Sequence, residues 1–217
     1  MGNIKIGRMA MGIYQTNLYF LYREGAPECI VVDAPDQGKE IVLKLEQHGF
    51  KVAALLLTHG HFDHVWGANE LRQFASSRGN GTVKIYAAKA EENVLLNPEL
   101  NVSAAMRRPV TVKANELLAD GQEVTIADMK FRCIVTPGHT EGSCCYYFEE
   151  AGILCAGDTL FLESVGRTDF PTGSGATLER SAKEKLFVLP EDTKVYPGHG
   201  DETTIGHEKK YNPFLVD

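Results

Sequence analysis

The sequence predicts an α/β (α+β) protein in which two β-sheets pack together with helices on their outer faces, a four-layer αββα sandwich. Two observations support this fold class. Each half of the chain contains several strand-like segments with helical stretches attached, and no linker, low-complexity segment or charge block separates the halves. We therefore expect residues 1–217 to form a single domain.

The first half begins with strands and continues with alternating helices and strands. Residues 14–22 are rich in aromatic and β-favouring side chains, and a second strand at 28–32 follows a Gly-Ala-Pro turn. A helix is expected from Asp36, as its cap, to about His48. The continuous apolar run at 52–57 is typical of a strand covered on both faces. A further helix is expected from about residue 64 to 77.

The second half contains two pairs of segments that have the pattern of hairpins. These pairs are residues 123–126 with 129–136, and residues 144–148 with 153–156. A helix from about residue 176 to 187 then precedes a strand at 194–196. Strands therefore dominate both halves, as a sandwich of two sheets requires.

Composition and charge exclude several classes of protein. The chain is 43% hydrophobic and 24% charged, which is ordinary for a globular enzyme, and its net charge of -7 disfavours a nucleic-acid partner. No apolar run approaches the roughly 20 residues that span a bilayer, and the N-terminus lacks an apolar signal core. The five cysteines are odd in number and lie in strand-like segments without a C-x-x-C spacing. Reduced, buried thiols in a cytoplasmic protein are the simplest interpretation.

One short segment carries three of the seven histidines. Residues 58–64 read Thr-His-Gly-His-Phe-Asp-His and follow the predicted buried strand directly. Because alternate side chains of an extended segment point the same way, His59 and His61 can hold one cation together. Asp63 and His64 are directed elsewhere and can serve a second cation. Imidazole and carboxylate are the ligands that an ion such as Zn(II) accepts readily.

Three further candidate ligands occupy similar positions. His139, Asp158 and His199 each come shortly after a predicted strand, and a glycine precedes each of them. Any one of these residues alone would indicate little. Together with the first cluster they provide seven nitrogen or oxygen ligands, enough for two metal ions that share a bridging carboxylate.

The order His-x-His-x-Asp-His, then a distant His, Asp and His, resembles the signature of the metallo-β-lactamase superfamily over residues 17–214. The resemblance implies the metallo-β-lactamase fold and two divalent metal ions, Zn(II) first, with Fe or Mn as alternatives. It assigns His59, His61 and His139 to one ion, Asp63, His64 and His199 to the other, and Asp158 to both.

Within that superfamily, residues 136–143 and 156–161 resemble glyoxalase II (hydroxyacylglutathione hydrolase). The sequence after His199 instead resembles the short stand-alone bacterial relatives of that enzyme. A single domain without a separate C-terminal substrate domain is therefore expected. The resemblance implies a thioesterase whose small-molecule substrate is a thioester such as S-lactoylglutathione. A metal-bridging hydroxide would be the nucleophile, and Asp63 would accept its proton.

Two alternatives remain open from the sequence. Residues 166–170, Gly-Arg-Thr-Asp-Phe, also resemble the persulfide dioxygenases, which would hold one Fe(II) on His59, His139 and Asp158. Another metallohydrolase such as a lactonase is the other alternative. Within this segment Arg167 is a candidate for binding a substrate carboxylate, although a surface salt bridge would also explain it.

Overall fold

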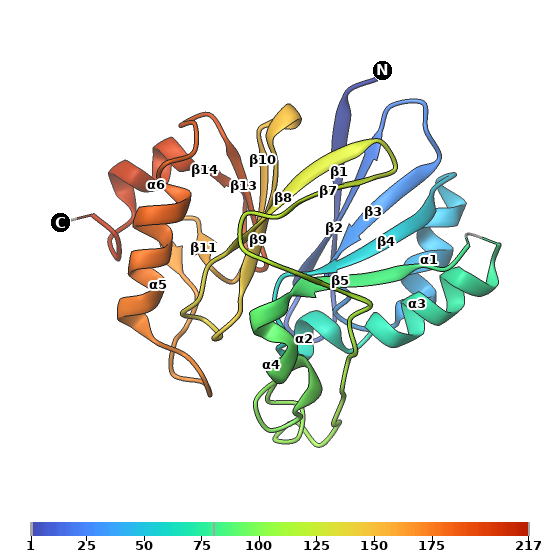
Figure 1. The fold of residues 1–217 in the computed structure, drawn as a ribbon, viewed down its shortest axis with the longest axis horizontal. Coiled ribbons are helices and arrows are strands. Elements are labelled where there is room, and N and C mark those ends of the chain that lie inside the picture. The colour runs from blue at the N-terminus through green and yellow to red at the C-terminus, as the bar shows by residue number, and fades with distance from the viewer. Residues whose placement is uncertain (1, 80, 217) are drawn as a thin grey trace.

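Two six-stranded sheets pack face to face, and helices cover the outer face of each, as Figure 1 shows. The computed structural model describes residues 2–79 and 81–216. The predicted arrangement of two sheets with outer helices is therefore confirmed. Among the residues described, no helix has both the length and the apolar character needed to cross a membrane.

The first sheet has the strand order β1-β2-β3-β4-β5-β6. The strands are β1 Ile4–Met11, β2 Thr16–Arg23, β3 Glu28–Val32, β4 Lys51–Leu57, β5 Lys84–Ala88 and β6 Glu116–Leu118. The first three are antiparallel neighbours, whereas β3 to β6 run parallel. Parallel neighbours need a crossover, and helices α1 (Gly38–Gln47) and α3 (Ala68–Ser77) provide two of them.

The second sheet has the order β14-β13-β10-β9-β8-β7. Its strands are β7 Glu123–Ile126, β8 Met129–Val135, β9 Cys144–Phe148, β10 Ile153–Gly157, β13 Lys194–Pro197 and β14 Thr203–Thr204. The pairs β7/β8 and β9/β10 are antiparallel, so both predicted hairpins are confirmed. β10 and β13 are parallel, and α5 (Gly175–Ser181) lies between them in the chain.

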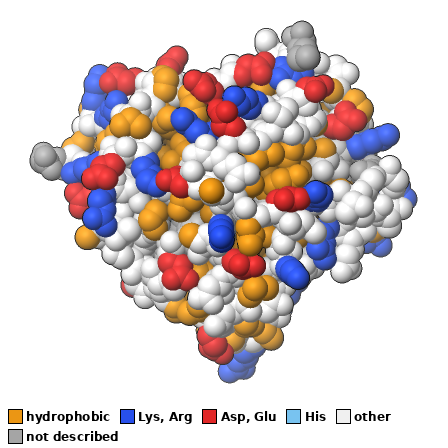
Figure 2. Space-filling model, viewed as in Figure 1, with side chains coloured by type: hydrophobic (Ala, Val, Ile, Leu, Met, Phe, Trp, Pro, Cys, Tyr) orange, Lys and Arg blue, Asp and Glu red, His pale blue; other side chains and the backbone are white. Residues whose placement is uncertain are grey.

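The remaining elements are short. They are α2 Phe62–Val65, α4 Glu92–Leu96, α6 Ile205–Tyr211, the strand pair β11 Leu160–Phe161 and β12 Ser164–Val165, and the turns Lys89–Glu91, Glu149–Ala151 and Ala182–Leu186. Helices α5 and α6 lie on the outer side of the second sheet, away from α1 and α3 (Figure 1). On the face shown in Figure 2, acidic and basic side chains alternate without a broad basic patch.

The alternation of side chains along each buried strand divides the apolar core into layers. Ile30 and Val32 of β3 face the second sheet and pack with Phe131 and Tyr146. Val31, between them, belongs to the cluster under α1 and α3. Strands β3 and β4 are therefore apolar on both faces, which explains the continuous apolar run predicted for β4.

Several predicted boundaries were wrong. The helix expected from 64 to 77 is broken into α2 and α3, because the Gly67 amide donates to the Ala34 carbonyl oxygen at 2.9 Å and not to the preceding helical turn. A Cβ at Gly67 would lie 2.9 Å from the Asp36 carbonyl oxygen, so the close approach needs glycine. Asp36 does not cap α1, which begins after Gln37 with a left-handed φ of 49°. Strand β1 was not predicted, and the helix expected to reach 187 changes to a π-helical turn after Ser181.

A buried hydrogen bond joins the two sheets and yields a stability prediction. The Tyr146 hydroxyl of β9 donates to the Leu57 carbonyl oxygen of β4 over 2.8 Å. Tyr146→Phe leaves that buried oxygen with a weaker partner, so the free energy of unfolding should fall by about 1–3 kcal/mol. Denaturant titration measures the change. Tyr147→Phe is the matched control, since no hydrogen bond of its hydroxyl is seen among the described residues, and an equal loss in both variants would contradict the prediction.

Candidate metal centre

The predicted site residues follow strands that end at one edge of the sandwich. The segment bearing His59 to His64 follows β4, and His139 follows β8. Asp158 comes directly after β10, and His199 follows β13. Because β4 belongs to the first sheet and the other strands to the second, the packing of the sheets brings the ligand segments together.

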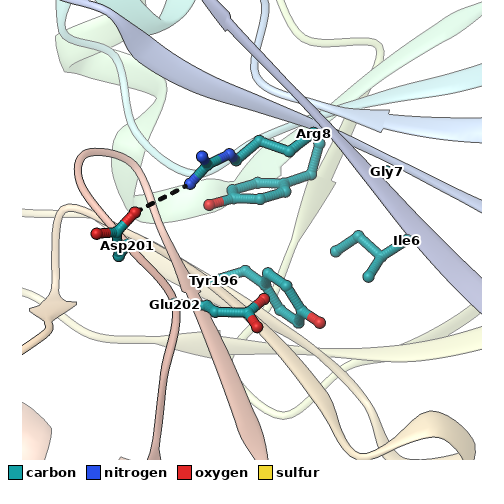
Figure 3. Close-up of a pocket in the computed structure, with 7 residues that line it drawn as sticks. Ile6, Gly7, Arg8, Tyr196, Asp201 and Glu202 are labelled. Atoms are coloured by element: carbon teal, nitrogen blue, oxygen red, sulfur yellow. Dashed lines mark ion pairs between the residues drawn. The ribbon is translucent and has the colours of Figure 1, made fainter.

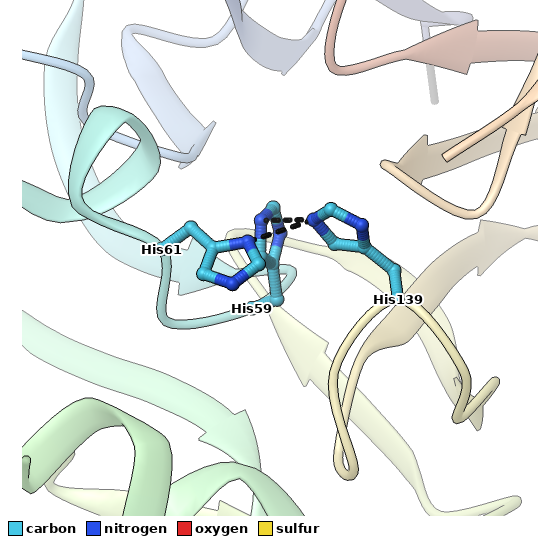
Figure 4. A group of neighbouring side chains, drawn as sticks. All are labelled: His59, His61 and His139. Carbon is cyan, nitrogen blue, oxygen red and sulfur yellow. Dashed lines mark hydrogen bonds between the residues drawn. The ribbon is translucent and has the colours of Figure 1, made fainter. Parts of the chain in front are cut away.

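Three imidazole rings form the first group of candidate ligands. His61 Nδ1 lies 2.8 Å from His139 Nε2, which in turn lies 3.2 Å from His59 Nε2. Figure 4 shows the rings turned toward a common point. The outer nitrogen of His139, Nδ1, lies 2.7 Å from the Arg167 carbonyl oxygen and must donate to it. Its Nε2 is therefore an unprotonated acceptor, the form that binds a cation.

The second group contains one carboxylate and two imidazoles. Asp63 Oδ2 lies 3.3 Å from His199 Nε2 and 3.9 Å from His64 Nε2. His64 is completely buried, and its Nδ1 contacts Asp33 Oδ2 at 2.8 Å. That contact fixes the proton on Nδ1, so Nε2 is presented to the centre of the group.

Asp158 lies between the two groups. Its Oδ1 is 3.3 Å from His64 Nε2, and its Oδ2 is 3.6 Å from both His139 Nε2 and His199 Nε2. Among the residues described, His64 Nε2 and Asp158 Oδ1 are buried without a hydrogen-bond partner. Buried polar atoms are rarely left unpaired. The donor set and these unpaired atoms fit divalent metal ions, which would satisfy them.

The electrostatics of the first group and of Asp158 match the protonation states that metal ligands need. Burial, together with the neighbouring His139, lowers the pKa of His61 to about 3. Burial also keeps the pKa of His59 well below its ordinary value. Burial would raise the pKa of Asp158, but the adjacent histidines, His64 first, lower it below its usual range. The imidazoles of the first group are thus neutral and the carboxylate is ionised. In the second group, burial would lower the pKa of His64, but the surrounding carboxylates, Asp158 first, raise it well above its ordinary value, so a metal ion there would displace a proton.

Two buried carboxylates at the site were missed by the sequence analysis. Asp33 accepts from the Thr58 amide and hydroxyl, each at 2.8 Å, and orients His64. Its position directly after the apolar strand β3 was an available signal, because the candidate ligands also follow strands. Glu91 accepts from Gly60 and Thr140, and burial raises its pKa to about 8 although these donors oppose the rise. Its local sequence holds no signal for this role.

The cluster lies at the bottom of a cavity of about 420 Å³ with largely apolar walls. Besides the ligands, the lining residues are Tyr14, Phe62, Val102, Met106, Phe161, Ser164, Val165, Arg167 and Phe170. Tyr14 and Phe62 touch edge to face with ring centroids 5.4 Å apart. The cavity can therefore take a small molecule whose reacting bond reaches the cluster and whose remainder contacts apolar surface.

Arg167 lines this cavity but already has a partner. Its guanidinium donates to both carboxylate oxygens of Asp169 at 2.7 Å and stacks 3.8 Å from the Phe170 ring centre. The salt bridge that was the alternative interpretation is thus present. The structure also shows a contact that the sequence did not reveal, since the Arg167 carbonyl holds the His139 ring.

A second cavity of about 420 Å³ contains none of the candidate ligands. Figure 3 shows its lining, in which Arg8 and Asp201 form an ion pair at 3.7 Å. Arg8 also donates to the Gly200 carbonyl at 3.2 Å. Tyr19 is among the residues that line this cavity. Asn17, two positions earlier in the chain, donates to the carbonyl oxygens of Pro197 and Gly200 at 3.0 and 2.9 Å. These contacts anchor the loop on which His199 is carried.

The other histidines and the cysteines lie outside the cluster. His48 Nδ1 contacts the Lys44 carbonyl at the end of α1, and His207 Nε2 contacts Glu163 at 2.9 Å. The five cysteines are free thiols and all are buried. Neither set contributes to the groups of candidate metal ligands found among the described residues.

Comparison with known proteins places these features in a family context. The family model described as "Metallo-beta-lactamase superfamily" matches residues 11–199. "Probable metallo-hydrolase YqgX" of Bacillus subtilis is 37% identical over 98% of this chain and 98% of its own length. "Hydroxyacylglutathione hydrolase GloC" of Haemophilus influenzae is 31% identical over 85% of this chain and 86% of its own.

Solved structures agree with the fold. The crystal structure of BLEG-1, described as a B3 metallo-beta-lactamase, has a TM-score of 0.90 and 35% identity, covering 98% of this chain and all of that one. The structure of TTHA1623 in a di-iron-bound form has a TM-score of 0.83 and 28% identity, with 96% and 100% covered.

Proposed function

Because the chain belongs to the metallo-beta-lactamase superfamily and is a metallo-hydrolase of that family, we propose that it hydrolyses thioesters with two divalent ions. S-lactoylglutathione is the first substrate to consider, and Zn(II) the first ion, with Fe or Mn as alternatives. One observation carries the proposal: the Asp158 carboxylate faces both groups of ligands at 3.3–3.6 Å.

Two of the three clusters of candidate ligands among the described residues give the proposed assignment: His59, His61 and His139 would hold one ion, and Asp63, His64 and His199 the other. Asp158, which forms the third cluster with His59 and His64 and lies 3.6 Å from both His139 and His199, would serve both ions. Two divalent cations at this place would supply hydroxide at neutral pH and polarise a carbonyl group. The relative with a di-iron-bound structure supports a site for two ions but leaves the metal of this chain open.

Asp63 is proposed as the catalytic carboxylate. It lines the cavity, and its Oδ2 accepts a hydrogen bond from Thr16 Oγ1 at 3.0 Å. Burial would raise its pKa, but His64 and His199 lower it below the ordinary value. An ionised carboxylate held in this way can orient the attacking water and accept its proton.

The chemistry of the cavity favours a thioester among the acyl compounds. A thiol has a pKa near 8.5, so a thiolate can leave without a proton from a dedicated acid. Apart from the proposed ligands and the paired Arg167, the cavity wall is mostly apolar. The likeness to GloC, which is named as a hydroxyacylglutathione hydrolase, adds support at 31% identity.

The proposal predicts two ions per chain. Metal analysis after purification without chelators should approach two divalent ions, and Asp158→Ala should lose most of both because its carboxylate would serve both ions. His207→Ala, outside the cluster, should keep both and is the control. A constant one ion per chain, with His64 and His199 replaceable at no cost, would contradict the two-metal proposal.

Activity should be hydrolytic and independent of oxygen. S-lactoylglutathione and smaller acyl thioesters should be cleaved under argon, with activity abolished by chelators and restored by Zn(II). Thiol release is the measurement. Rapid oxygen uptake by the iron-loaded protein with glutathione persulfide, lost in His139→Ala, would instead favour the dioxygenase. A covalent acyl-enzyme in rapid kinetics would exclude direct attack by water.

Arg167 should affect binding more than turnover. For a thioester that carries a carboxylate, Arg167→Ala should raise KM more than it lowers kcat. The reason is that the lost interaction stabilises the bound substrate and the transition state equally. Asp169→Asn is the complementary variant, because it weakens the ion pair and frees the guanidinium, so KM for the same substrate should fall. An unchanged KM in both variants, with a lower melting temperature for Arg167→Ala, would assign Arg167 to the salt bridge alone.

A further inference from the structure

Glu91 is a buried carboxylate that lies outside the set of candidate ligands but reaches the loops that carry them. It ends the 3-10 turn Lys89–Glu91 and immediately precedes α4, after strand β5 of the first sheet. Its side chain is fully buried. A buried carboxylate is costly unless hydrogen bonds compensate it, so its partners indicate why it is tolerated.

The carboxylate accepts hydrogen bonds from two separate loops. Oε1 accepts from the Gly60 amide at 2.7 Å, and Oε2 accepts from the Gly142 amide at 2.9 Å. The Thr140 hydroxyl lies 2.9 Å from Oε1 and 2.8 Å from Oε2. Gly60 lies between His59 and His61 in the sequence, and Thr140 directly follows His139. Glu91 therefore links the backbones on both sides of the three-histidine group.

Two glycines show how closely these loops fit the segment bearing Glu91. A Cβ at Gly142 would lie 2.2 Å from the Glu91 backbone nitrogen. A Cβ at Gly60 would lie 2.9 Å from Val94 Cγ1 and 3.3 Å from Glu91 Oε1. Both loops approach through positions without a side chain, so the two amides can reach one carboxylate.

We infer that Glu91 is a positioning residue that fixes His59 and His61 relative to His139 and so sets the geometry of one metal-binding group. This inference rests on the proposed metal centre. Metal sites need their ligands held within about 0.5 Å, and loops hold them less well than strands or helices do. Here the three imidazoles lie on loops from different sheets, and Glu91 is a shared anchor for the two loops.

The effect should be confined to one group. The second group has its own orienting carboxylate, since Asp33 holds His64 through Nδ1 at 2.8 Å and does not contact Glu91 in the contacts described. His199 is anchored by Asn17 and Arg8 through the backbone of its loop. Loss of Glu91 therefore leaves the supports of the second group in place.

The test is Glu91→Gln, which keeps the size of the side chain. A carboxamide has one acceptor oxygen, and its NH₂ group would face the amide of Gly60 or Gly142, so one of the two links is lost. We expect one of two Zn(II) ions to bind about 10–100-fold more weakly, with a much smaller change for the other. Competition with a chromophoric chelator measures both dissociation constants, and the Co(II) absorption spectrum reports the altered ligand geometry. Glu92→Gln, the exposed neighbour, is the matched control and should match the unaltered chain.

A second variant guards against a folding defect. Thr140→Val removes the hydroxyl donor and keeps Glu91, so it should weaken the binding of the same ion less than Glu91→Gln does. In the double variant the loss of binding free energy should be less than the sum of the two single losses, because both residues act in one contact. Equal weakening of both ions, or a lower melting temperature with both affinities retained, would overturn the positioning role. Metal binding by the unaltered chain tests the metal centre itself. The two metal affinities are measured without substrate, so they do not depend on which substrate the enzyme cleaves.

Discussion

The close approach of imidazole nitrogens and ionised carboxylates within a buried space is the constraint on which the rest of the structure depends. His61 and His139 present nitrogens 2.8 Å apart, and Asp158 lies between two groups of ligands. Buried polar atoms and charges are costly without partners. Divalent cations would supply those partners, so the fold and the proposed metal ions would stabilise the same arrangement.

The two sheets must stay in register for this arrangement to persist. One ligand segment follows the first sheet and the others follow the second, so a small shift between sheets would separate the groups. Such a shift is opposed by the apolar layer between the sheets and by the hydrogen bond that the Tyr146 hydroxyl donates to the Leu57 carbonyl oxygen. Asp33 and Glu91 then act locally, the one on an imidazole ring and the other on the backbone of two loops.

The cavity is suited to the proposed action of the centre on a small acyl compound. Charge is concentrated at the bottom of the cavity, where the carboxylates and imidazoles lie, and the walls above are largely apolar. Arg167, a basic residue in the lining of the cavity, is neutralised by Asp169. A substrate would therefore be oriented by contact with the walls and by its reacting group, while Asp63 is held ready by Thr16 and His199.

The sequence by itself determined the local features: the two hairpins, the apolar strand β4 and the seven candidate ligands, which were recognisable because residue type and spacing along the chain carry that information. Features that depend on long-range contacts were decided only by the tertiary structure. It broke the helix at Gly67, placed the Arg167 carbonyl on the His139 ring, and brought Asp33 and Glu91 to the ligand-bearing loops. The physical reason is that the energy of a buried carboxylate or a tight glycine contact depends on neighbours distant in the chain, and a local pattern does not specify those neighbours.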